Sequence, residues 1–260
     1  MVNILDTYVK KVPSDQNLLD IFKGEWSSQM PTDSGLVSEP GSAGLFNDIR
    51  ITWADKTLGG FLGKKLLELG PLEGGHTYML DRIGVKEIVS VEANTRAFLK
   101  CLIVKEIFKL KNSRFLLGDF VEYLEQSKDQ YDAIIASGVL YHMSNPLRLL
   151  ELISKHTDKV MLWTHYYDEA VIRINPALSA KFGKMETSQQ RGVVIECAIQ
   201  SYNEALNWNG FCGGSAPTSV WLTRNTLLEY LKALGFTHLN IANDDINHPN
   251  GPAFTVCAAK

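Results

Sequence analysis

The sequence is poor in the features that mark secreted and membrane-spanning chains. Its four cysteines, Cys101, Cys197, Cys212 and Cys257, lie far apart and form no CxxC pair. This spacing argues against a disulfide framework or a zinc knuckle and favours a reducing compartment. No apolar run approaches the roughly 20 residues that span a bilayer, and residues 1–11 carry charges in place of an apolar signal core. We therefore expect a soluble, cytoplasmic protein with no membrane partner.

An excess of positive charge is also missing. The 26 Lys and Arg residues are opposed by 29 Asp and Glu residues, which gives a net charge of -3. The overall charge therefore does not attract nucleic acid, although the sequence leaves room for a local basic patch. A small molecule is the expected partner, and the sequence is silent on the oligomeric state. Length and composition fit one large domain, or one domain with an appendage.

From residue 63 onward the chain alternates apolar strands with amphipathic helices. The most informative stretch is 65–94, KLLELGPLEGGHTYMLDRIGVKEIVSVEAN, in which a strand, a glycine-rich turn, a helix and a second strand follow one another. This is the layout of a nucleotide-binding βαβ unit. Further helices are expected over 95–110 and from Asn145-Pro146, where a capping residue precedes proline.

Seven strands are expected, over 65–69, 87–91, 113–117, 133–137, 160–165, 239–242 and 254–258. Strands that alternate with helices form a parallel sheet covered on both faces. The last two strands flank HPNGP, a tight-turn signal, and therefore form an antiparallel hairpin. The predicted fold class is α/β and Rossmann-like, with a mostly parallel seven-stranded sheet that ends in an antiparallel hairpin.

Two segments do not follow the alternation. Residues 1–60 read as a helical extension, with a short helix after Ser14, a loop over 29–44 and a helix across 45–58. Residues 168–220 read as a cap inserted after the fifth strand, before a helix expected over 221–234. We thus expect an N-terminal extension or lid at 1–60 and a main domain at 61–260 that carries the cap.

The glycine-rich turn contains Glu68, Gly70, Pro71 and Gly74. Glycine lets the backbone approach a ligand without a Cβ atom in the way. The spacing departs from GxGxxG, which makes a dinucleotide less favoured. A purely structural strand-to-helix turn is the alternative.

Acids end the next two strands. Glu92 lies 22 residues after Gly70, about the offset at which a carboxylate accepts hydrogen bonds from ribose hydroxyls. Asp119 can accept from an adenine amino group while Phe120 packs on the ring. The alternatives are a solvated strand-end acid at Glu92 and a helix N-cap at Asp119, and the N-cap can hold together with ligand binding.

Aromatic and histidine residues follow the fourth and fifth strands, at the edge where open α/β sheets bind ligands. Ser137 and Gly138 lead into Tyr141 and His142, and His165 ends the fifth strand. His142 is the first candidate for a general base near neutral pH. A structural histidine that bonds backbone groups is the competing interpretation for His142 and for His165.

The successive motifs ELGPLEGG, VEAN, LGDF and DAIIASGVLYHMSNPLRLL resemble those of class I S-adenosylmethionine-dependent methyltransferases. The resemblance covers about residues 63–167 and implies a Rossmann-like methyltransferase fold with S-adenosyl-L-methionine as cofactor. It implies that the turn binds the methionine end, that Glu92 holds the ribose and that Asp119 holds adenine. The implied cofactor contacts are Glu68, Gly70, Pro71, Gly74, Glu92, Ala93, Asp119, Phe120, Ser137 and Gly138. The implied activity is methyl transfer to a small-molecule acceptor, a metabolite or sugar, with O-methylation favoured.

GVLYH followed by Pro and Leu is also similar to the tRNA wobble-uridine carboxymethyltransferases. An RNA modifier of that kind is therefore the alternative function. An NAD-dependent oxidoreductase and a noncatalytic partner-binding module are the other competing classes.

Several further residues attract attention. We hypothesise that aromatic residues of the extension and the cap enclose the substrate, and that Arg50, Arg173 or Arg191 contacts an acidic group on it. No metal site is expected, because Asp244, Asp245 and His248 read as turn residues. The aromatic residues are Trp26, Phe46, Trp53, Tyr166, Tyr167, Phe182, Tyr202, Trp208 and Phe211.

Overall fold

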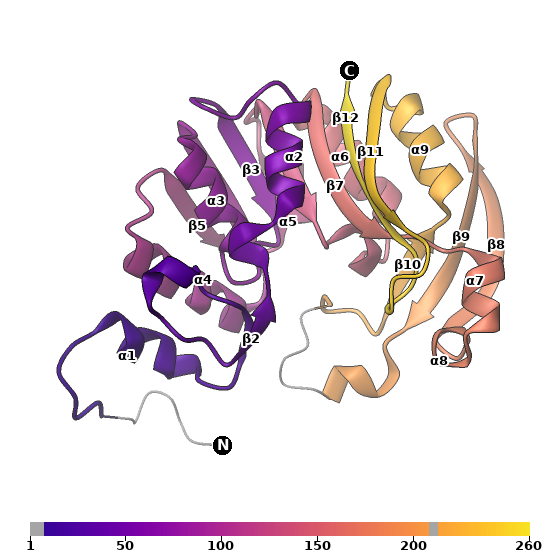
Figure 1. Cartoon of the computed structure of the whole chain (residues 1–260). Helices are drawn as coiled ribbons and strands as arrows, with labels where there is room; N and C mark the ends of the chain where they lie inside the picture. Colours follow the sequence, from indigo (N-terminus) through magenta and orange to yellow (C-terminus); the bar gives the residue numbers. More distant parts are fainter. Residues whose placement is uncertain (1–7, 208–212) are drawn as a thin grey trace.

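The structure, a computed structural model, describes residues 8–207 and 213–260. Its centre is a seven-stranded sheet with the order β11-β12-β7-β6-β3-β4-β5 (Figure 1). Strands β3 to β7 are parallel, and β12 runs antiparallel to both β7 and β11. The predicted α/β class, the strand number and the closing hairpin are confirmed. The strands are β3 (Lys65–Leu69), β4 (Glu87–Glu92), β5 (Ser113–Leu117), β6 (Ala133–Ser137), β7 (Lys159–His165), β11 (His238–Asp245) and β12 (Ala253–Ala259).

Helices cover both faces of this sheet because the central strands are apolar on both sides. Along β6, Ala133 and Ile135 pack into the core beneath α2 and α3, while Ile134 and Ala136 pack into the core beneath α5, α6 and α9. Successive residues of a strand point to opposite faces, so a continuous apolar run needs cover on both. The helices are α2 (Ile49–Thr57), α3 (Gly75–Ile83), α4 (Thr95–Phe108), α5 (Phe120–Gln126), α6 (Pro146–His156) and α9 (Arg224–Ala233).

Polar side chains at the helix starts fix where the helices begin. Asn94 accepts from the Ala97 amide at the start of α4, and Asn145 accepts from the Arg148 amide ahead of Pro146 in α6. The helix expected from 221 begins later, at Arg224, because Thr223 caps it while Trp221 still belongs to a strand. Short polar side chains at this position satisfy amides that the first helical turn leaves unpaired.

The N-terminal extension is more ordered than its sequence indicates. The helix after Ser14 is confirmed, with Ser14 as its N-cap. The loop expected over 29–44 is partly wrong, because residues 40–43 form a strand that pairs in parallel with β1. The extension lies beside α4 in Figure 1 and builds a satellite core with it. Its elements are α1 (Asp15–Leu19), η2 (Asp20–Phe22), β1 (Trp26–Ser28), η3 (Thr32–Ser34), β2 (Pro40–Ala43) and η4 (Leu45–Asn47).

A buried ion pair fastens this extension to the glycine-rich turn. Glu73, 1% exposed, lies in the turn between β3 and α3, and its carboxylate accepts from the backbone amides of Ser27 and Ser28 at 3.0 and 2.8 Å. Lys100 of α4 donates to the same carboxylate at 2.8 Å and also to the Glu25 carbonyl. A buried carboxylate persists only when it is paired and hydrogen-bonded. The extension supplies two of those partners.

The segment between β7 and α9 forms a small unit of its own at the other end of the molecule (Figure 1). It contains an antiparallel sheet of order β10-β9-β8. Trp208, Phe211 and Cys212 lie outside the described residues. Among the described residues, no helix is long and apolar enough to cross a membrane. The elements of the segment are α7 (Glu169–Ile174), α8 (Pro176–Ser179), β8 (Phe182–Gln190), β9 (Val193–Ser201), η6 (Asn203–Asn207) and β10 (Thr218–Leu222).

Gly75 sets how closely the extension approaches α3. A Cβ atom at this position would lie 2.8 Å from both the carbonyl carbon and the Cβ of Leu45. We expect Gly75→Ala to destabilise the protein by about 1–3 kcal/mol, because the Leu45 backbone must shift. Gly44→Ala is the control, since a Cβ atom there meets nothing within 4 Å. Urea unfolding of both variants provides the measurement, and equal stabilities would contradict the close contact.

Candidate functional site

A cavity of about 450 Å³ lies at the carboxyl ends of β3, β4, β6 and β7. Ten of the thirteen residues predicted for the site line it, which brings four separate motifs together. Glu68, Gly74 and His165 do not line it. The ten are Gly70, Pro71, Glu92, Ala93, Asp119, Phe120, Ser137, Gly138, Tyr141 and His142.

The glycine-rich turn presents backbone to this cavity. Gly70 has a φ of +65°, and a Cβ atom there would lie 2.6 Å from Cγ1 of Val139. A side chain at this position would thus strain the backbone and collide with the loop after β6. Gly74, with a φ of +77°, faces Phe115 and Val104 instead. Gly74 is therefore a packing position behind the turn.

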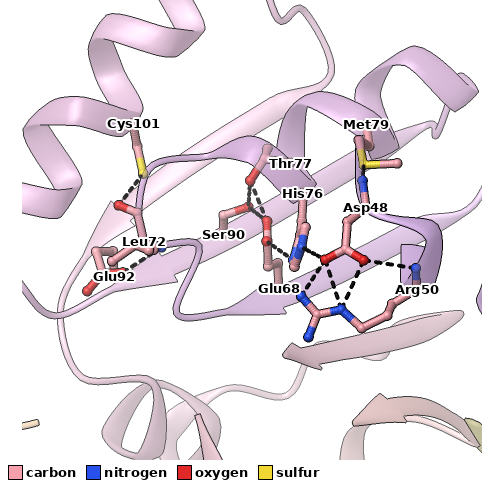
Figure 2. A network of polar contacts seen from close by, with 10 residues as sticks. All are labelled: Asp48, Arg50, Glu68, Leu72, His76, Thr77, Met79, Ser90, Glu92 and Cys101. Atoms are coloured by element: carbon pink, nitrogen blue, oxygen red, sulfur yellow. Dashed lines mark hydrogen bonds and ion pairs between the residues drawn. The ribbon is translucent and has the colours of Figure 1, made fainter. Parts of the chain in front are cut away.

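Glu68 lies underneath the turn. Its side chain is 2% exposed, and its Oε2 accepts from the hydroxyls of Thr77 and Ser90, the latter at 3.0 Å (Figure 2). Burial raises the pKa of Glu68. The carboxyl group joins the end of β3 to the first turn of α3 and to β4, so it supports the turn from below.

Glu92 fills the position expected for an acid at the end of β4. Its Oε2 accepts from the Leu72 amide at 3.1 Å and its Oε1 from the Asn94 amide at 2.8 Å. Burial raises the pKa of Glu92, although these backbone amides act in the opposite direction. Both oxygens are held by backbone while the side chain lines the cavity, which leaves accepting capacity on each oxygen for a ligand hydroxyl.

Asp119 is both a helix cap and a lining residue of the cavity. Its Oδ1 accepts from the Val121 amide at 2.7 Å and caps α5, and the residue also lines the cavity. Capping and ligand contact are therefore compatible here. Phe120, the first residue of α5, lines the cavity next to it.

His142 and Tyr141 lie at the other end of the cavity, after β6. His142 Nδ1 and the Tyr202 hydroxyl are 2.7 Å apart, so the inserted segment orients the imidazole. Burial, with a contribution from His165, lowers the pKa of His142 to about 4. His142 is therefore neutral at physiological pH.

His165 matches the structural interpretation. It is 4% exposed, its Nδ1 donates to the Gly251 carbonyl at 2.8 Å, and its ring stacks on Trp221 at a centroid distance of 5.0 Å. Burial lowers the pKa of His165 to about 4. Since His165 is absent from the cavity lining, its contacts fit a packing role behind Tyr141, whose ring lies 4.6 Å away.

A buried network joins Asp48 and Arg50 of the extension to His76 of α3 and Glu68 of β3 (Figure 2). The Asp48 carboxylate accepts from the Arg50 guanidinium through Nε at 2.9 Å and contacts His76 Nε2 at 2.9 Å. Burial alone would raise the pKa of Asp48, but the hydrogen bonds from His76 and Arg50 hold it below its usual range. Arg50 and His76 both line the cavity.

Of the three arginines considered for an acidic substrate, Arg50 alone lines the cavity. Arg173 pairs with Glu169 and Arg191 with Glu151, both away from it. None of the named aromatic residues that the structure describes lines the cavity, although Tyr202 contacts the lining residue His142. Trp26 and Phe46 pack against α4, and Tyr167 and Phe182 pack within the inserted segment. The aromatic rings that do line the cavity are those of Phe120, Tyr141 and Trp163.

Nine lining residues are not indicated by the sequence motifs. Asn94 directly follows the Glu92 motif, and Trp163 shares its strand face with His165, so both carried a usable signal. Leu72, His76, Val139 and Met143 lie within or next to the predicted motifs. Leu45, Gly214 and Ser215 come from distant segments that only the tertiary structure brings together. The missed lining residues are Leu45, Leu72, His76, Asn94, Val139, Met143, Trp163, Gly214 and Ser215.

The turn interpretation is wrong for Asp244 and Asp245, which belong to β11, whereas His248 lies in the connection from β11 to β12. Asp244 pairs with Arg224 at 2.7 Å, Asp245 accepts from the Asn247 amide, and His248 Nδ1 accepts from the Asn250 amide. Within residues 8–207 and 213–260, no group of three acidic, histidine or cysteine side chains is placed to hold a metal ion.

Sequence comparison finds only local relatives. No family model matches the chain. A tRNA U34 carboxymethyltransferase of Campylobacter hominis is 32% identical over 89 residues, which are 34% of this chain and 30% of the relative. An enzyme of the same name from Sulfurimonas denitrificans is 43% identical over 68 residues, 25% of this chain and 22% of the relative. The chain thus matches less than a third of the length of these relatives.

Comparison of structures covers far more of the chain. The N-terminal domain of EvdMO1, crystallised in the presence of S-adenosylhomocysteine (SAH) and D-fucose, has a TM-score of 0.69 at 20% identity over 94% of both chains. An S-adenosylmethionine-dependent methyltransferase of Mesorhizobium loti has a TM-score of 0.56 at 13% identity, covering 84% of this chain and 100% of its own. A 1,6-didemethyltoxoflavin N1-methyltransferase of Burkholderia thailandensis, with 1,6-didemethyltoxoflavin and S-adenosylhomocysteine bound, has a TM-score of 0.54 at 12% identity, over 84% and 78%. The chain has the fold of the class I S-adenosylmethionine-dependent methyltransferases.

Proposed function

We propose that the chain is an S-adenosylmethionine-dependent methyltransferase that acts on a hydroxyl group of a small molecule. The observation that carries this proposal is that the expected cofactor-binding residues and the candidate catalytic residues lie at opposite ends of one cavity. The Gly70 turn, Glu92 and Asp119 lie towards β3, β4 and β5, while Tyr141, His142 and Trp163 lie towards β6 and β7. A cofactor and an acceptor can therefore meet end to end. Structural neighbours that hold SAH in this fold support the assignment.

Each cavity residue has a role in this proposal that its geometry permits. Gly70 and Pro71 bring backbone close to the methionine end of the cofactor. Glu92 accepts from the ribose hydroxyls, and Asp119 accepts from the adenine amino group while Phe120 packs on the ring. Glu68 and Gly74 act indirectly, by holding the turn. Ala93, Ser137 and Gly138 form a further part of the wall.

Both appendages contribute to the enclosure. Leu45 and Arg50 of the extension and Gly214 and Ser215 of the inserted segment line the same cavity as the sheet-end residues. We infer that residues 1–60 act as a lid and residues 168–220 as a cap. An enclosed space excludes water and holds the acceptor in line with the methyl group. A small acceptor, a sugar or another metabolite, fits this enclosure, in keeping with the D-fucose and 1,6-didemethyltoxoflavin named for the neighbours.

We propose that His142 takes the acceptor proton, since it lines the cavity next to Tyr141. With Nδ1 donating to the Tyr202 hydroxyl, the lone pair of Nε2 is the accepting site. The bound cofactor supplies an electrophilic methyl group on a sulfonium. His142 removes the hydroxyl proton as the new bond from oxygen to carbon forms, and later releases that proton to water.

A tRNA wobble-uridine carboxymethyltransferase activity is the second candidate, and the local identity of 32–43% to enzymes of that name favours it. The net charge of -3 speaks against binding to a polyanion. Gel-shift titration with unmodified tRNA decides between the candidates. We expect no complex at 150 mM salt, and a tRNA complex whose affinity falls steeply with salt would favour the RNA modifier.

Glu92 tests the cofactor claim. We expect Glu92→Ala to weaken SAH binding at least about tenfold, because two charge-assisted hydrogen bonds to the ribose are lost. Glu92→Gln keeps the shape and should weaken binding less. Glu87→Gln is the control, since Glu87 lies at the opposite end of the same strand. Calorimetric titration with SAH gives the affinities, and unchanged binding in Glu92→Ala would refute the ribose contact.

His142 tests the proton acceptor. We expect His142→Ala to lower kcat about 10²-fold or more, measured as SAH release with the acceptor hydroxyl compound. Since burial lowers the pKa of His142 to about 4, the neutral base persists above about pH 5 and is lost as pH falls through 4. Protonation of His142 should therefore cause no change in kcat from about pH 5 upward. Tyr202→Phe should lower kcat less, because it removes a contact that orients the imidazole but leaves His142 itself in place. Full activity of His142→Ala across pH would exclude the role.

A further inference from the structure

A second hollow of about 640 Å³ lies between the N-terminal extension and the β11–β12 hairpin. It shares Leu45, Arg50 and Trp163 with the site cavity, so the two spaces are neighbours on either side of these residues. We call it the hairpin groove. Its other lining residues are Ala43, Gly44, Asn47, Asp48, Ile49, Asn243, Asp244, Asp245, His248 and Ala253.

The charges of the hairpin groove disfavour an anion. Among the described lining residues, Arg50 is the one lysine or arginine, and its guanidinium is engaged by Asp48 through Nε at 2.9 Å. Asp244 is engaged in turn by Arg224, at 2.7 Å. Asp245 uses Oδ1 to accept from the Asn247 amide at 3.0 Å. The lining therefore carries more negative than positive charge, with its cation already neutralised.

The β11–β12 hairpin has an irregular backbone where it borders this groove. The pairing of β11 with β12 passes from Ala242 opposite Thr255 to Asp245 opposite Ala253, so β11 holds one extra residue at this point. Asn243 within this bulge has a φ of +50°, a left-handed conformation. Bulges re-aim side chains and are common beside active sites. Asn243 and Asp244 of the bulge line the groove, as does Asp245, where regular pairing resumes.

The remaining lining combines hydrogen-bonding groups with an aromatic ring. Asn47 and Asn243 offer amide donors and acceptors, Asp245 offers carboxylate oxygens, and His248 offers Nε2–H because its Nδ1 accepts from Asn250. The Trp163 ring lies at the boundary, with the Arg50 guanidinium 4.5 Å from its centroid. Convergent polar groups around an apolar ring suit a ligand that alternates hydroxyls with C–H faces.

We propose that the hairpin groove binds a neutral, hydroxyl-rich acceptor of the pyranose sugar class and presents one hydroxyl past Arg50 and Trp163 towards His142. This assignment rests on the proposed methyltransferase function for the direction of transfer. The acceptor loses its hydroxyl proton to Nε2 of His142, its oxygen bonds to the methyl carbon, and the bond from that carbon to the sulfonium breaks. The products are a methyl ether and SAH, and the proton passes to water.

D-fucose and D-galacturonate test the proposal as a matched pair of probes. They share their ring stereochemistry, but D-galacturonate has a carboxylate where D-fucose has a methyl group. Affinities come from saturation-transfer NMR titrations, run with and without saturating SAH. The groove variants are Asp245→Asn, which keeps the Oδ1 that accepts from Asn247, and Asn47→Ala. Asp158→Asn is the control, because Asp158 is 80% exposed, pairs with Lys260 and lines neither space.

We expect D-fucose to bind, with its Kd raised about threefold to tenfold in both groove variants and unchanged in Asp158→Asn. D-galacturonate should bind at least about tenfold more weakly than D-fucose. Three outcomes would overturn the proposal. D-galacturonate could bind as tightly as D-fucose or more tightly, D-fucose could fail to bind, or the Kd of D-fucose could be the same in the groove variants as in the unmodified protein. SAH calorimetry separates the two claims. Failure of SAH to bind would sink the methyltransferase function, while the titrations without SAH would still decide the groove.

Discussion

Two buried carboxylates hold the N-terminal extension against the sheet-and-helix unit, and the shape of the site depends on them. Glu73 takes amides of the extension on one side and Lys100 on the other, while Asp48 bridges Arg50 and His76. Removing one partner of a buried pair leaves an uncompensated charge and costs roughly 3–5 kcal/mol. The extension is thus anchored at the glycine-rich turn and at the first turn of α3, the two places that border the cavity.

This anchoring also decides the electrostatics of the site. Arg50 stands between the two hollows, but Asp48 neutralises it and fixes it beside the Trp163 ring. A mobile, unpaired arginine in the same place would favour an anionic ligand, whereas the fixed pair leaves a polar wall of low net charge. The histidines follow the same logic. Burial keeps His142 and His165 neutral, yet His142 borders the cavity and His165 is held by backbone and aromatic contacts.

Most of the sheet was predictable because each central strand is apolar on both faces and ends in a turn signal. Strands β3, β5 and β6 begin and end at the predicted residues. Helix starts followed from capping residues such as Asn145. Helix α5 is too short to give a clear helical periodicity in the sequence. Strand β2 has the composition of a loop, because its proline, glycine and serine mask a pairing with β1. Such pairing is decided by a distant partner and leaves little local signal.

By itself, the sequence determined the α/β fold and most of one wall of the site, because ligand-facing groups follow the carboxyl ends of consecutive parallel strands. Gly70, Glu92, Asp119 and His142 could be named for that reason. Tertiary structure alone decided that Glu68, Gly74 and His165 stand behind the wall, and that Leu45, Arg50 and Ser215 complete it. The physical reason is that burial, pairing and close approach between segments depend on contacts over long sequence separations, which residue spacing does not encode.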